Sequence, residues 1–255
     1  PQIPHSPYND ITGLPEWDSS YDSDTNFPSL SAQAKQWSAM VTRIDAHFGN
    51  ILDALDDPNG DGSTNDSVAA NTLVIFQSDN GGAGNDGLSK LGANGNLRDK
   101  KGSIWEGGIR IPMVMRWPAM IHGNSAVQPG TNTQRVVDST DLLPTFCELA
   151  GVEAPLGVDG VSLASYLMGT AGGRSRDFVI HEAQPDRSIV HGDMKLVDDN
   201  GALKLYDLGA DPSESTNIAS ANAALVAELS TLMYGERVAE AQWSANTYHD
   251  WMGSD

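Results

Sequence analysis

Apolar side chains recur at intervals of three and four residues after a polar opening stretch. Residues 1–28 are rich in Pro, Asp, Ser and Tyr and predict an irregular loop. From Ser29 onward the spacing places one apolar stripe on a single long helix, formed by Trp37, Met40, Val41, Ile44, Phe48, Ile51, Leu52 and Leu55. The helix is predicted to end before Pro58, because proline cannot continue it.

Two continuous apolar runs predict strands. TLVIFQS, residues 72–78, is short and unbroken, which is typical of a strand buried on both faces of a parallel sheet. Together with the preceding helix and loop it favours an α/β crossover. IRIPMVMRW, residues 109–117, predicts another strand that ends at Pro118. Residues 138–150 then predict a helix that Asp141 caps and Gly151 ends.

The C-terminal third changes to short strands. FVIHE, SIVHG, MKLVD and LKLYDL predict an antiparallel four-stranded sheet with tight turns at 192–193 and 199–201. A last helix is predicted from the apolar positions Leu225, Val226, Leu229, Leu232 and Met233. The fold class is therefore α/β, followed by a small C-terminal antiparallel subdomain with a helix.

A glycine-rich stretch at 169–173 is the best candidate for a domain boundary. It separates two predicted domains, residues 1–168 and residues 174–255.

Composition narrows the classes of partner. The 255 residues carry 34 acidic and 15 basic side chains, a net charge of −19. Phosphate binding needs basic patches, so the charge argues against nucleic acid as a partner. No apolar run reaches the length of a membrane span, and no membrane partner is expected. Cys147 is the only cysteine, so no intrachain disulfide can form, and its position in a helical pattern favours burial.

The strand at 72–78 ends in an acid and an amide. Asp79 and Asn80 are hard oxygen donors that suit Ca²⁺ or Mg²⁺, and ligands in open α/β sheets bind beyond the carboxyl ends of strands. The alternative is an ordinary Asn-Gly turn that closes the strand. Downstream, Arg98, Lys100 and Lys101 form a basic cluster. Such a cluster could hold an anionic oxygen group beside a cation; the alternative is a solvated basic loop.

A second acidic stretch resembles a calcium loop in its first half only. Asp57, Asn59, Asp61 and Gly62 follow the pattern D-x-N-x-D-G, but Val68 stands where a bidentate Glu should complete the coordination. A solvated loop is therefore favoured over a calcium site at 57–66.

Five segments in order resemble the sulfatases of the alkaline phosphatase superfamily. They are FQSDNGG, LRDKKGSIWEGGIRIPMVMRWP, GVDGVSLASYLMG, HGDMKLV and LYDLGADPSESTNIA, and the resemblance extends over nearly the whole chain. It implies the later part of a mixed sheet sandwiched by helices, followed by the small antiparallel subdomain. It also implies a type I sulfatase, a sulfuric ester hydrolase that uses Ca²⁺ or Mg²⁺.

The resemblance assigns roles to particular residues. Asp79 and Asn80 map onto a pair that binds the metal, and Lys101 maps onto the lysine that contacts the substrate sulfate. Lys100 lies one position away, where the family usually has glycine, so it and Arg98 are further candidates for substrate binding. The stretch PHSP maps His5 onto an active-site histidine, which could protonate the leaving group. We expect His5, Asp79, Asn80 and Lys101 to converge.

The chain also departs from the family pattern. It contains no C-x-P-S-R type motif from which a formylglycine is made, and Cys147 precedes ELA. The paired aspartates that open the metal site are absent too. We therefore expect only the C-terminal portion of a sulfatase, inactive alone, whose partner is the missing N-terminal half with the formylglycine. The chain also begins without Met or a signal peptide.

The expected substrate is a sulfated small molecule or polysaccharide, and the expected location is periplasmic or secreted. Two alternatives stay open. One is a catalytically inactive truncated module. The other is a phosphodiesterase or phosphonate hydrolase of the same superfamily, against which the segment EGGIRIP favours a sulfatase.

Overall fold

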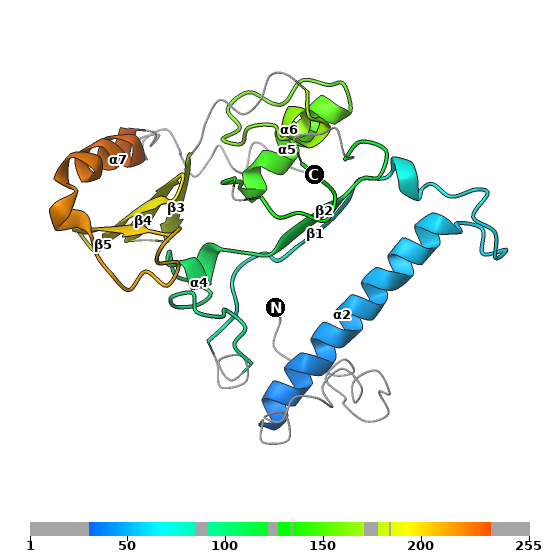
Figure 1. The fold of residues 1–255 in the computed structure, drawn as a ribbon, viewed down its shortest axis with the longest axis horizontal. Helices are drawn as coiled ribbons and strands as arrows, with labels where there is room; N and C mark the ends of the chain where they lie inside the picture. Colours follow the sequence, from blue (N-terminus) through cyan, green and yellow to red (C-terminus); the bar gives the residue numbers. More distant parts are fainter. Residues whose placement is uncertain are drawn as a thin grey trace, which may run out of the picture.

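A long helix is the first element of the part of the chain that the structure describes. The computed structural model describes residues 31–84, 91–121, 127–133, 135–170, 178–183 and 185–235. Helix α2, Ala32–Asp56, begins where the backbone N–H of Ala34 donates to Ser31 Oγ, and ends at Asp57, so its predicted end before Pro58 is confirmed (Figure 1). Within the described residues, no helix has the length and apolar character needed to cross a membrane.

Strands β1, Val74–Gln77, and β2, Met113–Arg116, form an antiparallel two-stranded sheet. The sequence predicted that β1 would lie in a parallel sheet and be buried on both faces. Within the described residues that prediction is wrong. The side chain of Phe76 is 38% exposed and that of Val114 is 61% exposed. The continuous apolar run of β1 suits a strand covered on both faces, and the two-stranded ribbon leaves part of that surface open.

The predicted strand at 109–117 is shorter than its apolar run. Ile109, the first residue of the predicted strand, is the last residue of helix α4, Glu106–Ile109. Strand β2 begins only after Pro112. Proline has no backbone N–H to donate to a neighbouring strand, which accounts for the late start.

The predicted helix at 138–150 begins differently from the expectation. A 3₁₀ turn, η3 (Ser139–Asp141), leads into α5, Leu142–Leu149, and α6, Ala164–Met168, follows. Asp138 rather than Asp141 is the cap, because its side chain accepts the Thr140 N–H. The Asp141 carboxylate instead accepts the backbone N–H groups of Asp138 and Val161.

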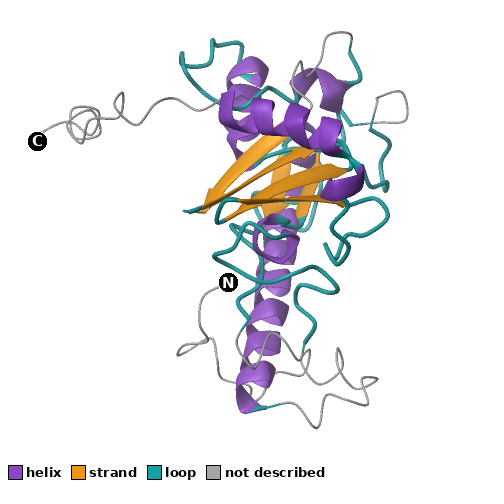
Figure 2. Cartoon of the chain, turned by 90° about the vertical axis from the view of Figure 1, so that its left-hand side faces the viewer, coloured by secondary structure: helices purple, strands orange, loops and turns teal. Residues whose placement is uncertain are grey.

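The C-terminal sheet matches the prediction. Strands β3 (Phe178–Ala183), β4 (Asp186–His191), β5 (Met194–Asp199) and β6 (Ala202–Asp207) pair antiparallel in chain order. The short η4 (Ala219–Ala221) precedes helix α7, Ala223–Gly235, which covers one face of this sheet (Figure 2). The fully buried core on that face is made by Ile189, Leu196, Leu205, Leu229 and Met233.

The other face of the same sheet is covered by a segment from the first half of the chain. Ile104 and Trp105, just before α4, pack with Val197 and Tyr206 in a second buried cluster. Neighbouring residues of a strand point to opposite faces, so Leu196 serves one cluster and Val197 the other. Figure 1 shows α4 between the two sheets. These contacts reach across the predicted boundary at 169–173, which stays a prediction.

A polar contact also joins the two parts of the chain. Asp138 Oδ2 lies 3.4 Å from His181 Nε2 on β3. The hydrogen bond from His181, followed by those from Thr140, holds the pKa of the Asp138 carboxyl well below its usual value of 3.8. A carboxylate with a depressed pKa adds stability above its unfolded-state pKa and loses it as the pH falls.

Replacement of Asp138 by asparagine tests this contact. The new amide side chain would keep a cap oxygen but would carry no charge at any pH, so the Asp138→Asn variant should be less stable than wild type at pH 6. The difference in the free energy of unfolding should shrink as the pH falls from about 4 toward 2. Urea unfolding across this pH range measures it. A difference that stays constant with pH would contradict the assignment.

Candidate active site

The end of β1 carries the predicted metal ligands. The Ser78 hydroxyl donates to the Asn80 carbonyl at 2.8 Å, and the Asn80 side-chain amide donates to the Gly81 carbonyl at 2.7 Å. The amide nitrogen of Asn80 is thereby engaged, and its side-chain oxygen remains as an acceptor. Asp79 is exposed. The turn therefore presents a carboxylate and an amide oxygen at the end of the strand.

The basic loop is bound to this strand end by backbone hydrogen bonds. The Lys101 N–H donates to the Gly82 carbonyl at 3.0 Å, and the Gly81 N–H donates to the Gly108 carbonyl at 2.9 Å. Asn94 adds a side-chain bridge, because its Oδ1 accepts from the Gly82 N–H at 2.7 Å. The structure thus brings the Lys101 backbone beside the strand end that bears Asp79 and Asn80. The roles of these side chains stay predictions.

Glycine is required where the two segments touch. A Cβ atom at Gly81 would lie 1.9 Å from the Gly107 carbonyl oxygen, and one at Gly107 would lie 2.2 Å from the Asp99 carbonyl oxygen. Both obstacles are backbone atoms, which cannot turn aside as the end of a flexible side chain can. The glycines of DNGG and EGG therefore permit the close approach of two backbones.

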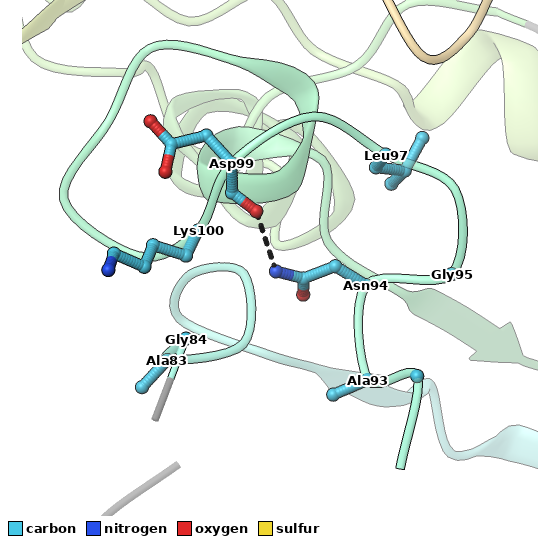
Figure 3. A pocket seen from close by; sticks show the side chains of 9 residues that line it. Ala83, Gly84, Ala93, Asn94, Gly95, Leu97, Asp99 and Lys100 are labelled. Carbon is cyan, nitrogen blue, oxygen red and sulfur yellow. Dashed lines mark hydrogen bonds between the residues drawn. The ribbon is translucent and has the colours of Figure 1, made fainter. Parts of the chain in front are cut away.

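A shallow pocket of about 250 Å³ lies beside this contact. Figure 3 shows Asn94, Asp99 and Lys100 around it, with the Asn94 amide donating to the Asp99 carbonyl at 3.1 Å. Lys100 lies against Gly84, where an added Cβ would come within 2.3 Å of Lys100 Cδ. Lys100 and Lys101 are both exposed, and within the described residues neither forms an ion pair.

Arg98 makes contacts of a different kind. Its guanidinium stacks on the Trp105 ring at 3.5 Å from the ring centroid, and Nη1 donates to the Glu214 carbonyl at 3.1 Å and the Tyr206 hydroxyl at 3.2 Å. The guanidinium is thus held against the C-terminal sheet. A role of Arg98 in substrate binding stays a prediction, and these internal contacts count against it.

A buried ionic cluster, formed by Glu106, Lys195 and Glu214, was not expected from the sequence. Lys195 Nζ lies 2.9 Å from Glu106 Oε1 and 2.8 Å from Glu214 Oε1, and all three residues are at most 4% exposed. Burial raises the pKa of Glu214. A signal did exist, because Lys195 lies among the apolar residues Met194, Leu196 and Val197 of β5 and points to the same side of the strand as Val197.

The donor set at the strand end fits a hard divalent cation only in part. Asp79 and Asn80 supply two oxygens, whereas Ca²⁺ takes six to eight. Across the described ranges, no three His, Cys, Asp or Glu side chains come together as a metal site. His5 lies outside the described residues, so its convergence with Asp79 stays a prediction.

The acidic loop at 57–66 binds its own backbone. The Asp57 carboxylate accepts N–H groups from Gly60, Asp61 and Gly62 at 2.8–3.1 Å, and the loop is largely exposed. This fits the solvated turn favoured from the sequence, and calcium binding there is untested.

Two family models match the chain. The model described as Sulfatase matches residues 3–152, and the model described as N-sulphoglucosamine sulphohydrolase, C-terminal, matches residues 96–239. The two overlap over the segment that contains Arg98 to Gly108.

Individual proteins show the same similarity. A sulfatase of Formosa agariphila is 33% identical over 210 residues, which are 73% of this chain and 35% of that protein. The crystal structure of Ps i-CgsB in complex with k-i-k-neocarrahexaose has a TM-score of 0.69 at 25% identity, over 98% of this chain and 52% of the other. The phosphonate monoester hydrolase of Agrobacterium radiobacter shares the fold, with a TM-score of 0.56 at 24% identity over 80% of this chain and 41% of that one. This chain thus spans between about a third and half of each.

Substitution of Gly81 tests the close backbone contact. Gly81→Ala should destabilise the fold by about 3 kcal/mol, because the new methyl group would overlap the Gly107 carbonyl. The matched control is Gly49→Ala in α2, where nothing lies within 4 Å of the added Cβ and alanine should stabilise the helix by about 0.5–1 kcal/mol. Urea unfolding measures both. Equal stability of the two variants would contradict the contact.

Proposed function

Because the chain belongs to the sulfatase family, we propose that it is the C-terminal portion of a sulfuric ester hydrolase. The observation that carries the proposal is the backbone hydrogen bond from Lys101 to Gly82. This bond joins the backbone of the loop that carries Lys101 to the strand end of Asp79 and Asn80, which supports the proposed sulfate-binding role of Lys101. The sulfatase assignment therefore rests on an arrangement of residues as well as on sequence similarity.

The proposed chemistry has two parts: Lys101 stabilises negative charge and His5 transfers a proton. Cleavage of a sulfate ester builds negative charge on the sulfate and leaving-group oxygens. The Lys101 ammonium is exposed and would bind sulfate oxygens as that charge grows. His5 would donate a proton to the leaving oxygen. The nucleophile, a formylglycine in this family, would come from a part of the protein outside this chain.

A divalent cation completes the proposed site. Asp79 and Asn80 would hold it through their side-chain oxygens, with the remaining ligands supplied from outside this chain. When bound, such a cation supplies positive charge that stabilises the developing negative charge on sulfate. Ca²⁺ is proposed because both donors are hard oxygens, and Mg²⁺ is the alternative.

The proposed substrate is a sulfated carbohydrate. Ps i-CgsB was crystallised with k-i-k-neocarrahexaose, which supports this class for a chain that is similar to it along nearly its whole length. A sulfated small molecule is the alternative. The net charge of −19 fits a periplasmic or secreted enzyme, and that location is part of the proposal.

Two other functions compete with this proposal. A phosphonate hydrolase has the same fold, but both matching family models describe sulfatases or sulphohydrolases. An inactive module is the second alternative, and activity of the complete protein distinguishes it.

Replacement of Lys101 tests the proposed sulfate contact. In the complete protein that contains this chain, Lys101→Ala should lower kcat/KM for an aryl sulfate by about 10²–10³-fold, the usual cost of removing one charge-stabilising group. Lys100→Ala, the matched control one residue away, should have a smaller effect. Steady-state kinetics measure both, and the 255-residue chain alone should show no turnover. A larger loss for Lys100→Ala would transfer the role to Lys100.

Calorimetry tests the metal donors directly. The isolated chain should bind Ca²⁺ with a Kd of about 10⁻⁴ M or weaker, because two side-chain oxygens leave most coordination positions to water. Asp79→Ala should abolish that binding, whereas Asp61→Ala should leave it unchanged. Micromolar binding that is lost only in Asp61→Ala would instead place the cation in the loop at 57–66.

A further inference from the structure

The ionic cluster joins the C-terminal sheet to the start of α4. Lys195 comes from the centre of the sheet on β5, Glu106 from the start of α4, and Glu214 from the loop after β6. The second carboxylate oxygen of Glu214 accepts the backbone N–H of Glu106 at 2.8 Å. The cluster therefore fixes a backbone position as well as pairing charges.

Arg98 extends the cluster into the basic loop. Its guanidinium lies between the Trp105 ring and the backbone carbonyl of Glu214, while its own backbone carbonyl accepts the Gly107 N–H at 2.7 Å. The loop from Arg98 to Gly107 is thus closed at its base, with Lys101 at its exposed part. Gly108, the next residue, accepts the hydrogen bond from Gly81 at the strand end.

Stability alone is a weak explanation for this cluster. Burial of one ammonium and two carboxylates is costly, and apolar side chains of similar size often stabilise a fold as well or better. Hydrogen bonds between charged groups are directional, because each bond fixes an angle and a distance, whereas apolar contacts do not. The contacts that they fix here are those at the base of the Lys101 loop.

We propose that Lys195, Glu106 and Glu214 are positioning residues, which hold the Lys101 loop against the strand end that carries Asp79 and Asn80. Glu214 is the key member, because it binds Lys195, the Glu106 N–H and, through its carbonyl, Arg98. The C-terminal sheet would thus set the geometry of a site whose proposed residues Asp79, Asn80 and Lys101 lie in the first half of the chain. The predicted effect on catalysis rests on the proposed function, whereas the claim that the cluster holds the loop does not.

Amide hydrogen exchange of this chain tests the structural content. Glu214→Ala should accelerate exchange at the amides of Lys101 and Gly107 by about 10–100-fold, the effect of losing a hydrogen bond to a charged group. Exchange at the amide of Leu229 in α7 should accelerate about tenfold less than exchange at the loop amides, because it reports opening of the whole subdomain. The matched control is Glu182→Ala, which breaks an ion pair with Arg187 on the same sheet and should leave the loop amides unchanged.

Two further variants keep the test decisive. Glu214→Gln retains an acceptor for the Glu106 N–H and should restore most of the protection of the loop. Arg98→Lys keeps the charge but loses the planar guanidinium that stacks on the Trp105 ring, and should accelerate the loop amides even if Glu214→Ala does not fold. Equal acceleration of loop and α7 amides, or unchanged loop exchange in Arg98→Lys, would overturn the proposal.

Kinetics of the complete protein test the consequence. Glu214→Ala should lower kcat/KM for an aryl sulfate by about tenfold or more, as expected when a positioned group is displaced, and Glu182→Ala should not. No effect of Glu214→Ala on an active enzyme would overturn the positioning role. A wild-type protein that cleaves no sulfate ester would remove the proposed function, while the exchange experiment would still decide whether the cluster positions the loop.

Discussion

One buried lysine determines how the two parts of this molecule fit together. Lys195 is fully buried and lies between Glu106 and Glu214. Removal of the lysine would leave two carboxylates buried without the ammonium that pairs them, which is among the most destabilising changes in a protein core. The packing of Ile104 and Trp105 on Val197 and Tyr206 surrounds the same contact. The position of the Lys101 loop, and through it the neighbouring strand end, depends on this arrangement.

Local pattern predicted much of the fold. Helix α2, the four strands of the C-terminal sheet and the apolar face of α7 all follow from spacings of a few residues, and each is confirmed. The stripe on α2 is only partly covered, because Val41, Ile44 and Ile51 are exposed. The pairing of β1 was wrong because a continuous apolar run reports burial, not the direction of the neighbouring strand. The cap of the helix at 138–150 was misplaced by three residues, because Asp138 and Asp141 both suit a cap and only the hydrogen bonds distinguish them.

A motif was enough to predict which segments adjoin, whereas the roles of the candidate site residues stay predictions. Asp79, Asn80 and Lys101 lie on adjoining segments, as the resemblance to sulfatases implied. Lys195 in an apolar stretch was a signal for the ionic cluster, but its partners were not predictable, because the hydrogen bonds connect residues 89 and 108 positions apart. Arg98 was grouped with the lysines by charge, yet its guanidinium is held by Trp105 and the C-terminal sheet. Sequence neighbours of equal charge can thus have opposite surroundings, and composition alone does not separate them.

The two-stranded ribbon has a consequence for handling the chain as a purified protein. Within the described residues β1 and β2 pair only with each other, and Phe76 and Val114 are partly exposed beside open strand edges. Such edges are templates for pairing with another chain. The net charge of −19 makes copies of the chain repel one another. Salt shortens the range of this repulsion, the Debye length, to about 8 Å at physiological ionic strength. Colloidal stability of this chain is therefore expected to depend on ionic strength, and concentrated solutions to be most durable in dilute buffer.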